Sequence, residues 1–335
     1  MAKNKTPTIY DVAQRAGVSI TTVSRMLNAP DKVNPETRDR ILAAIDALGF
    51  VPKAEARARA LRQTGRIGVI TPFFTAPSFV QRLRGVASVL SKSSYELVIY
   101  PVETLDHLQG YLSSIPVMRN LDGLVIMSMA IDPQDAKRLI DNGMQTVLIE
   151  YQHPELSSIV IDDFEGGRLV GEHILSKGHR IIGFIGDIEP PERLQIHPVL
   201  SRLKGLQSVL EKNNVPLPEA YIRSAPYMQE ESKQAARELL GLPQPPTVIF
   251  AAADVQALAV LKVAREMGLK VPEQLAVVGF DDIDSADYLD LTTIRQHLDE
   301  SGKLAVEILL SHIADPSRPP QHVNLPLILI ERETA

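Results

Sequence analysis

The sequence predicts a small all-α head followed by a larger α/β core with parallel, doubly wound sheets. Residues 8–28 have the pattern of two short helices joined by a glycine turn. From residue 66 onward, short apolar runs alternate with helix-like segments, as in two successive parallel α/β units. Residues 1–66 carry 12 Lys and Arg against 6 Asp and Glu, whereas the remainder carries 23 against 35. A basic head on an acidic body indicates a polyanion-binding module joined to a unit that does not bind polyanions.

Composition narrows the class of protein further. A chain of 335 residues that is 44% hydrophobic is long enough for two or three domains with buried cores. It has no run of about 18 apolar residues and no hydrophobic signal segment at its start, so we expect a cytoplasmic protein without membrane contact. The absence of cysteine excludes disulfides and thiolate metal sites. We expect neither a metal nor a cofactor.

The first helix of the head begins at a polar cap and ends at a glycine. The Thr8 hydroxyl can cap this helix, and Asp11 in its first turn suits the positive end of the helix dipole. Gly17 permits a positive φ at the turn, and Ser19 supplies the N-cap of the second helix. The expected buried seam consists of Val12, Ala13, Val18, Val23 and Leu27.

The second helix leaves a set of mostly short polar side chains facing outward. They are Ile20, Thr21, Thr22, Ser24, Arg25 and Asn28. The Arg25 guanidinium can grip a guanine edge with two hydrogen bonds. This segment is therefore predicted to be a helix-turn-helix whose second helix enters a DNA major groove. Ile20 has an alternative interpretation as a core residue of the head.

A third helix is expected to close the head. Asn34 and Pro35 form a strong helix start, and Gly49 ends the helix. Apolar residues recur at helical spacing between these ends, at Ile41, Leu42, Ile45 and Leu48. A head of about 50 residues is marginal as an independent fold.

Residues 52–62, P-K-A-E-A-R-A-R-A-L-R, have two interpretations. Composition alone favours a solvated helical linker, because no apolar face is wide enough to bury. Alternatively, the segment becomes helical when two copies of the chain meet over DNA. In that case Leu61 inserts between base steps of the minor groove, while Arg57, Arg59 and Arg62 lie on phosphates.

The core is expected to contain two series of strands and helices. The first series has strands at 67–70, 97–100, 123–127 and 146–150, with helices such as 79–90 and 133–142. The second has strands at 159–162, 181–186, 248–252 and 276–282, with helices at 164–177, 201–213 and 255–268. The last part contains L-T-T-I-R-Q, a helix at 298–313 and a strand-like segment at 324–332. Ligand sites in such units lie at the carboxyl ends of strands.

Four segments carry a family resemblance: T-I-Y-D-V-A-Q-R-A-G-V-S-I-T-T-V-S-R-M-L-N, G-H-R-I-I-G-F-I-G, V-P-E-Q-L-A-V-V-G-F-D-D and L-T-T-I-R-Q. Through them the whole chain resembles the lactose/galactose-repressor family of bacterial transcription regulators. The resemblance implies a headpiece at 1–51, a hinge helix at 52–65 and a two-lobed core like a periplasmic sugar-binding protein at 66–335. The first lobe is expected at about 66–160 plus part of 291–325, and the second at about 161–290 plus the C-terminal strand.

The resemblance also assigns DNA contacts. It places Thr8, Tyr10, Ser19 and Asn28 on the DNA backbone and groove edges, Arg25 on a base, and Ile20 and Thr21 at the family's operator-choosing pair. Ser24, Asn34, Thr37, Arg59 and Leu61 complete the expected set. Ile20 cannot hydrogen-bond a base edge, so it favours an apolar contact such as a thymine methyl.

The hinge departs from the family pattern. Leu61 stands nine positions after Pro52 rather than seven, and Lys53 replaces the usual asparagine. Two extra residues rotate a helix by about 200°. Either the hinge helix starts later, or the chain lacks the minor-groove wedge.

In the core, the resemblance places an effector pocket between the lobes. Its expected residues are Phe73, Phe74, Asp162, Asp163, Arg202, Asp254 and Asp281. Carboxylates and an arginine suit sugar hydroxyls, and an aromatic face can cover a pyranose. From the residues alone, Asp162 and Asp281 can equally be helix caps and Phe73 a core residue. Ala253 stands where the family has an asparagine.

These observations predict a homodimeric regulator of transcription, with repression the expected outcome. Its expected partners are a pseudo-palindromic DNA operator and a small-molecule effector, expected to be a sugar or a derivative. The competing interpretation is a sugar-binding module or a sugar-processing enzyme with a fused DNA-binding head. The sequence has no G-x-S-x-G elbow, no phosphate loop with its lysine and no H-E-x-x-H, so we expect no catalytic residue.

Overall fold

The computed structural model describes residues 7–28, 33–48, 50, 64–189, 196–226 and 229–335. The chain divides into two compact units, Met1–Thr64 and Gly65–Ala335, called here the head and the core. Within the described ranges, no helix combines the length and the apolar composition that a membrane span requires.

The head packs three helices around one small apolar cluster. They are α1 (Ile9–Ala16), α2 (Ile20–Asn28) and α3 (Pro35–Leu48). The cluster consists of Val12, Ala13, Ala16, Val23, Met26, Val33, Ile41 and Ala44. Leu42 is not part of this cluster. Its side chain is exposed, because it lies outside the buried face of α3. The predicted contribution of Leu42 to the core is therefore wrong.

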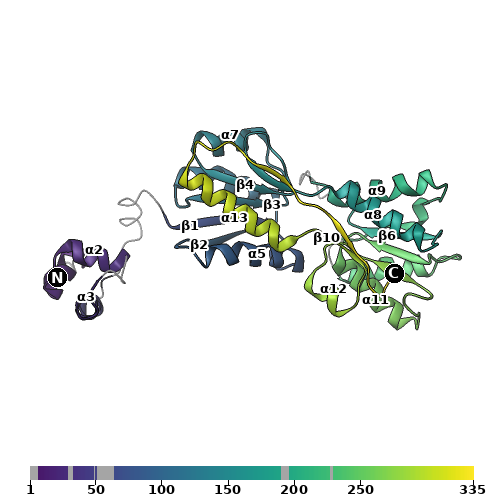
Figure 1. Cartoon of the computed structure of the whole chain (residues 1–335), viewed down its shortest axis with the longest axis horizontal. Helices are drawn as coiled ribbons and strands as arrows, with labels where there is room; N and C mark the ends of the chain where they lie inside the picture. The colour runs from purple at the N-terminus through teal and green to yellow at the C-terminus, as the bar shows by residue number, and fades with distance from the viewer. Residues whose placement is uncertain (1–6, 29–32, 49, 51–63, 190–195, 227–228) are drawn as a thin grey trace. The chain divides into compact units, whose positions relative to one another are not determined.

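The first lobe of the core is a six-stranded parallel sheet in the order β11-β5-β4-β3-β1-β2 (Figure 1). Its strands are β1 (Arg66–Pro72), β2 (Glu96–Val102), β3 (Gly123–Met127), β4 (Gln145–Ile149), β5 (Ser157–Val160) and β11 (His322–Asn324). Helices α5 (Pro77–Leu90) and α13 (Leu298–Ala314) cover one face, and α6 (Leu105–Met118) and α7 (Pro133–Asp141) cover the other. Every residue of β3 is buried, as expected for a parallel strand covered on both faces.

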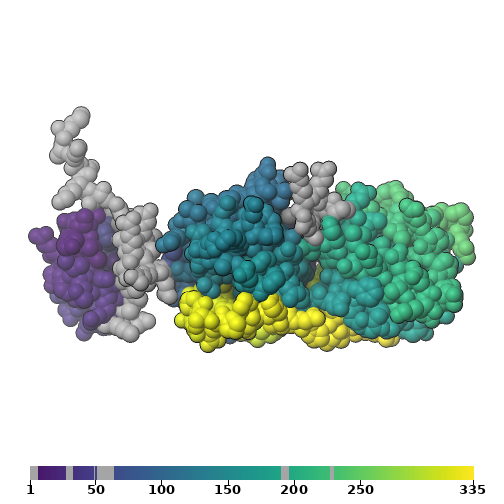
Figure 2. Space-filling model, turned by 90° about the horizontal axis from the view of Figure 1, so that it is seen from above, coloured from purple at the N-terminus to yellow at the C-terminus, as the bar shows by residue number. Residues whose placement is uncertain are grey.

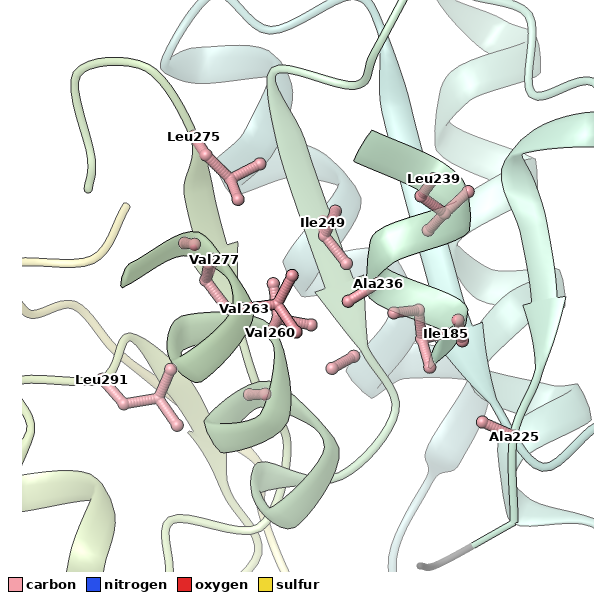
Figure 3. Packing of buried hydrophobic residues seen from close by; sticks show 14 of the residues in the cluster. Ile185, Ala225, Ala236, Leu239, Ile249, Val260, Val263, Leu275, Val277 and Leu291 are labelled. Atoms are coloured by element: carbon pink, nitrogen blue, oxygen red, sulfur yellow. The ribbon is translucent and has the colours of Figure 1, made fainter. Parts of the chain in front are cut away.

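The second lobe is a four-stranded parallel sheet in the order β7-β6-β8-β9. Its strands are β6 (Ile182–Gly186), β7 (Ile222–Ser224), β8 (Val248–Ala251) and β9 (Ala276–Val278). Its α-helices are α8 (Asp163–Ser176), α9 (Pro198–Lys212), α10 (Gln229–Leu240), α11 (Asp254–Glu266) and α12 (Asp284–Tyr288); the short 3-10 helix η2 spans Glu219–Tyr221. Figure 3 shows Ala236 and Leu239 of α10 and Val260 and Val263 of α11 beside the sheet residues Ile185, Ile249 and Val277. Helices α8 and α9 pack apolar side chains against the other face of the sheet.

Two strand predictions need correction. The strand predicted to open the second series, 159–162, is β5, which pairs with β4 and β11 in the first sheet. The chain therefore adds one more strand to the first sheet before it continues into α8. The single strand predicted at 324–332 is divided, because Pro326 interrupts it. Asn324 is the last residue of β11, and Ile328–Ile330 form β12, which pairs with β10 (Thr293–Arg295).

The C-terminal part of the chain belongs to both lobes. Helix α13 packs on α5 in the first lobe, and β12 then joins the second lobe through β10. Figure 2 shows this last segment running along the first lobe and onward to the second. The lobes are thus linked by several crossings of the chain, which suits a cavity between them.

Helices α6 and α10 lie in segments whose pattern predicts no specific helix. Helix α6 contains Gly110 and Pro116, which weaken its helical signal. Helix α10 is mostly polar and shows only a narrow apolar face.

Candidate functional site

Polar caps begin the second and third helices of the head. The Ser19 hydroxyl accepts a hydrogen bond from the Thr22 backbone nitrogen at 3.1 Å. The Asn34 side-chain oxygen accepts one from the Glu36 backbone nitrogen at 2.9 Å. Both predicted caps are therefore confirmed, and they fix the starts of α2 and α3.

The turn between α1 and α2 also matches its prediction. Gly17 has φ +66°, the left-handed conformation that glycine adopts without a steric penalty. At the start of α1, the Asp11 carboxylate accepts from both the backbone nitrogen and the hydroxyl of Thr8, at 2.7 and 2.6 Å. The Thr8 hydroxyl is therefore held against Asp11 at the start of α1.

Most predicted DNA contacts lie on the surface of the head. Thr8, Tyr10, Ser19, Ile20, Thr21, Arg25 and Asn34 are exposed, and Ser24 and Thr37 are half-buried. Ile20 is 39% exposed and lies outside the head's buried cluster, which argues against its core interpretation. Tyr10 is 66% exposed.

Other predicted contacts lie outside the described part of the chain. These are the hinge residues Arg57, Arg59, Leu61 and Arg62, together with the side chain of Asn28. Their assignment stays a prediction, and so does the choice between a solvated linker and a DNA-bound hinge helix.

The core holds a cavity of about 180 Å³ that both lobes line. Four of the lining residues, Ser128, Glu150, Asp187 and Ala252, directly follow the strands β3, β4, β6 and β8. The cavity therefore lies at the carboxyl ends of the parallel strands, where the sequence predicts a ligand site.

An almost fully buried arginine organises the first-lobe wall of the cavity. Arg82 on α5 donates from Nη2 to the Glu150 carboxylate, and the Ser128 hydroxyl donates to the same carboxylate. Burial raises the pKa of Glu150, but the charge and hydrogen bond of Arg82, with the bond from Ser128, outweigh burial and lower it to about 2. Glu150 is therefore an anion at neutral pH, and its charge is matched by Arg82.

A chain of hydrogen bonds connects this wall of the cavity to the second lobe. Arg82 Nη2 donates to Gln296 Oε1 at 2.9 Å, and Gln296 Nε2 donates to the Asp281 carboxylate. Gln296 follows β10, where the chain crosses between the lobes, and Asp281 follows β9 in the second lobe. One buried network thus links Glu150 of the first lobe to Asp281 of the second.

A second buried arginine forms the opposite wall. Arg202 on α9 donates from Nε to Asp163 at 2.8 Å and from Nη1 to the Ala252 carbonyl at 2.6 Å. Its guanidinium lies 3.6 Å from the centroid of the Phe280 ring, a cation-π contact. These three contacts hold the side chain in one orientation.

Each arginine lies on a helix that packs closely against a second helix at a glycine of that second helix. A Cβ at Gly302 of α13 would lie 2.0 Å from the Arg82 carbonyl oxygen, and a Cβ at Gly167 of α8 would lie 1.8 Å from that of Arg202. Such contacts exclude any larger residue at the two glycines. Close helix packing therefore sets the depth at which each guanidinium enters the cavity wall.

The lobes are also joined at the surface. Arg84 of α5 makes two hydrogen bonds to Asp284 of α12, at 2.7 and 3.0 Å, and two to Asp299 of α13, at 2.7 and 2.8 Å. The Asp284 backbone nitrogen donates to Gln81 Oε1 at 3.0 Å. The bonds that involve Asp284 connect the first lobe to α12 of the second.

The structure brings together only some of the predicted effector residues. Phe73, Arg202 and Asp281 line the cavity, and Asp163 lies behind Arg202 as its ion-pair partner. Phe74 is exposed and does not line the cavity, because the chain turns sharply at Phe73, whose φ is +45°.

Two predicted effector residues form hydrogen bonds within the protein instead of lining the cavity. Asp162 accepts from the Glu165 backbone nitrogen at 3.0 Å and so caps α8, which was its alternative interpretation. Asp254 is fully buried and accepts from Ile283 N at 2.9 Å and Thr293 Oγ1 at 2.6 Å. Neither residue lines the cavity.

Asp254 holds the loop that presents Asp281. Asp281 has φ +128°, a conformation that side chains rarely adopt, so the loop needs support from its surroundings. Burial, with the nearby charge of Asp281, raises the pKa of Asp254 well above its ordinary 3.8. Asp254 therefore supports the site without reaching the cavity.

Several cavity residues were missed from the sequence. Ser128 follows the predicted strand 123–127 and Glu150 is the last residue of the predicted strand 146–150, so strand ends offered a signal for these two. Gln296 ends the L-T-T-I-R-Q segment, for which no strand was predicted. Arg82 and Gln256 lie on helices, where no local pattern separates a cavity residue from a surface one.

Comparison with known proteins places the head and the core in one family. The model of bacterial regulatory proteins of the lacI family matches residues 8–53, and a periplasmic binding protein-like domain matches residues 171–335. The HTH-type transcriptional repressor PurR of Escherichia coli O139:H28 is 31% identical over 335 residues, covering 98% of this chain and 96% of that protein.

Solved structures agree with this assignment. The lac repressor dimer bound to operator and the anti-inducer ONPF has a TM-score of 0.77 at 27% identity, covering 98% of this chain and 99% of that one. A LacI family transcriptional regulator from Enterococcus faecium with bound ribose has a TM-score of 0.71 at 27% identity, covering 81% and 98%. These relatives are named as regulators rather than as enzymes. This chain belongs to the lacI family of bacterial regulatory proteins, and it is a DNA-binding transcriptional repressor with a helix-turn-helix headpiece and a two-lobed, periplasmic-binding-protein-like core.

Proposed function

We propose that a small sugar or sugar derivative, bound in the core cavity, controls the affinity of this repressor for its operator. The observation that carries the proposal is the buried network from Glu150 through Arg82 and Gln296 to Asp281, which joins both lobes across the cavity. A ligand that inserts among these groups changes contacts in both lobes at once. The ribose-bound relative supports a sugar as the class of ligand.

Effector binding in the core and operator binding by the heads are linked through their free energies. An effector that favours one arrangement of the lobes alters the hinge, and thereby the affinity of the heads for operator. In this scheme residues 1–51 read DNA, residues 52–65 form the hinge and residues 66–335 form the sensor. Couplings of this kind are typically about 1 to 3 kcal/mol.

In the head, we assign major-groove contacts to α2 and backbone contacts to the helix starts. Arg25 is exposed on α2 and is assigned to a base, and Ile20 and Thr21 beside it are assigned to groove-floor contacts. The capping residues Ser19 and Asn34 lie at helix N-termini, where phosphates bind favourably.

We propose that the working form is a homodimer on a pseudo-palindromic operator. The lac repressor relative is a dimer on its operator, and Tyr288 at the end of α12 is 86% exposed here, as an aromatic ring at a subunit interface is before assembly. Sedimentation of wild type and Tyr288→Asp checks this. A wild-type dimer weakened by the substitution supports the proposal, and a wild-type monomer at micromolar concentration rejects it.

We further propose that the cavity binds its ligand without transforming it. The effector is then recovered chemically unchanged after prolonged incubation with the protein. Because the ligand acts on DNA binding, the protein works where the chromosome lies, in the cytoplasm.

The assignment of Arg25 is tested with the full chain. An operator is first selected from a random DNA library by the wild-type protein, and Arg25→Ala is then measured on every single-base variant of it. We expect a loss of about 1 to 3 kcal/mol and relaxed choice at one base pair. Arg15→Ala on α1 is the matched control. Unchanged affinity and unchanged base preference in Arg25→Ala would remove Arg25 from the reading face.

A further inference from the structure

An exposed cluster of charged side chains joins the two lobes outside the cavity. Arg84 of α5 lies between two carboxylates, that of Asp284 on α12 and that of Asp299 on α13. Helices α5 and α13 pack in the first lobe, whereas α12 packs in the second. None of these three side chains lines the cavity. The cluster therefore connects the lobes at a place that a ligand in the cavity does not touch.

Every nitrogen of the Arg84 guanidinium donates to one of the two carboxylates. Nη1 and Nη2 donate to Asp284 at 2.7 and 3.0 Å, and Nε and Nη2 donate to Asp299 at 2.7 and 2.8 Å. Both pairs are bidentate, a geometry that fixes orientation as well as adding interaction energy. Because Nη2 bonds to both residues, one positive charge lies between a carboxylate of each lobe.

Asp299 is held beside Arg84 by the packing of their own lobe. A Cβ at Gly85, the neighbour of Arg84, would lie 1.9 Å from the Asp299 carbonyl oxygen, so α5 and α13 are in backbone contact there. Only glycine permits so close an approach. The Asp299 carboxylate therefore stays beside Arg84 whatever the position of the second lobe, and Asp284 is the partner that a movement of the lobes would separate.

A second bond from α5 holds the start of α12. Gln81 lies three residues before Arg84, and its Oε1 accepts from the Asp284 backbone nitrogen at 3.0 Å. Backbone nitrogens at the start of a helix lack partners within the helix. Ile283, the N-cap of α12, supplies no side-chain bond. The first lobe thus caps a helix of the second lobe and fixes Asp284 opposite Arg84.

The charge of Arg84 decides whether the lobes attract or repel one another at this edge. The hydrogen bond from Arg84 lowers the pKa of Asp284 below its ordinary 3.8, so this carboxylate is an anion at neutral pH. Without the guanidinium, the carboxylates of Asp284 and Asp299 would face each other as like charges from different lobes. About half of the Arg84 side chain is exposed, so salt screens both the attraction and the repulsion.

We infer that Arg84, Asp284 and Asp299 form an electrostatic latch that holds the lobes in the arrangement described, and that this latch sets the ratio of latched to open cores from outside the cavity. Gln81 positions Asp284 within the latch. An effector that changes the arrangement of the lobes acts with or against the latch. The consequence for DNA rests on the proposed function, in which the arrangement of the lobes controls operator affinity.

The ratio of latched to open cores is measured with a single cysteine in the full-length protein. The chain has no cysteine of its own, so Ala253→Cys reports alone; this position lines the cavity and is 2% exposed. Iodoacetamide, an uncharged thiol reagent, gains access when the lobes open, so the modification rate follows the open fraction. We expect Arg84→Met to raise this rate about two- to fivefold, the range for an exposed ion pair. An unchanged rate overturns the inference.

Two controls separate opening of the lobes from unfolding. Ala236→Cys lies fully buried in α10, away from the cavity, and its modification rate should be the same with and without Arg84→Met. Arg237→Met breaks an ion pair with Glu266 at 2.9 Å that is exposed to a similar degree but lies within the second lobe. It should leave the rate of Ala253→Cys unchanged. An equal rise in either control contradicts the latch.

A second substitution and salt test the electrostatic origin of the effect. In Arg84→Met/Asp299→Asn the like charges no longer face each other, so the rate should fall by about twofold toward that of the protein with Arg84. Salt should raise the rate when Arg84 is present, because it screens attraction, and lower it in Arg84→Met, because it screens repulsion. A double variant as open as the single one, or salt effects of the same sign in both proteins, overturns the inference.

Operator affinity is measured on the same proteins, with DNA selected by the wild type. Arg84→Met should change the operator dissociation constant by about two- to fivefold, because the population of latched cores changes by that factor. If the cavity opens but operator affinity is unchanged, the latch stands and the proposed function fails. If Arg84→Met does not open the cavity, the latch fails and the proposed function is unaffected.

Discussion

The head and the core place their functional residues in opposite ways. In the head, the predicted DNA contacts project outward from helices whose buried side is one small cluster. In the core, Arg82, Glu150 and Asp281 point inward and depend on one another for their charge and orientation. The head can therefore change what it reads one side chain at a time, whereas the cavity responds as a network. The two units are expected to differ accordingly under mutation.

The largest expected effect comes from breaking the buried ion pair. Arg82→Met leaves the Glu150 carboxylate buried without its counter-charge, which typically costs about 3 to 5 kcal/mol. Urea unfolding of the core, followed by circular dichroism, measures this loss. The stability of the head should be unaffected. A fall of less than about 1 kcal/mol in the unfolding free energy of the core would show that the cavity residues do not depend on one another.

A substitution in the head sharpens the contrast. Ile41→Ala opens the head's only described apolar cluster and should cost about 2 to 5 kcal/mol locally. Because the head is marginal, we expect operator binding to be lost while the main thermal transition of the core is unchanged. A matching fall in the melting temperature of the core would mean that head and core unfold as one unit.

Acid pH tests the same network without mutation. The pKa of Glu150 is lowered from its ordinary 4.5 to about 2, so its ion pair stabilises the folded state fully above pH 4.5. That contribution is lost as the pH falls from 4.5 toward 2. We expect wild type to lose roughly 3 kcal/mol more than Glu150→Gln across this window. Parallel stability curves for the two proteins would contradict the assignment.

The smallest effect is expected two residues along α5. Arg84 makes more hydrogen bonds than Arg82, but about half of its side chain is exposed, so water screens its ion pairs. Arg84→Met should therefore destabilise the core by less than about 1 kcal/mol. Equal effects of Arg82→Met and Arg84→Met would remove burial as the source of the difference.

This contrast also explains what the sequence could predict. The caps Ser19 and Asn34 and the turn at Gly17 act within three residues of themselves, so local patterns reveal them. Outward residues of a short helix follow from its period once the buried ones are known. The three helices of the head, two of their caps and the turn at Gly17 were therefore predicted from the sequence, whereas Leu42 was not placed correctly.

The cavity residues were harder to predict from the sequence, because they meet only in the folded chain. Gln296 contacts Arg82 across 214 positions of sequence, and no period or motif links them. Asp162 and Asp254 have the residue type that a ligand site needs, yet each bonds to backbone or to a neighbouring side chain instead. Strand ends gave the correct edge of the sheets, but helix residues such as Gln256 required the packing itself.

Ligand binding in the cavity is proposed to be coupled to operator binding by the head. The most direct measurement is the operator dissociation constant of the full-length protein with and without saturating effector, together with the effector dissociation constant with and without operator. Linkage predicts the same factor in both directions, about 5-fold to 150-fold. An effector that binds the cavity but leaves operator affinity unchanged would contradict the account.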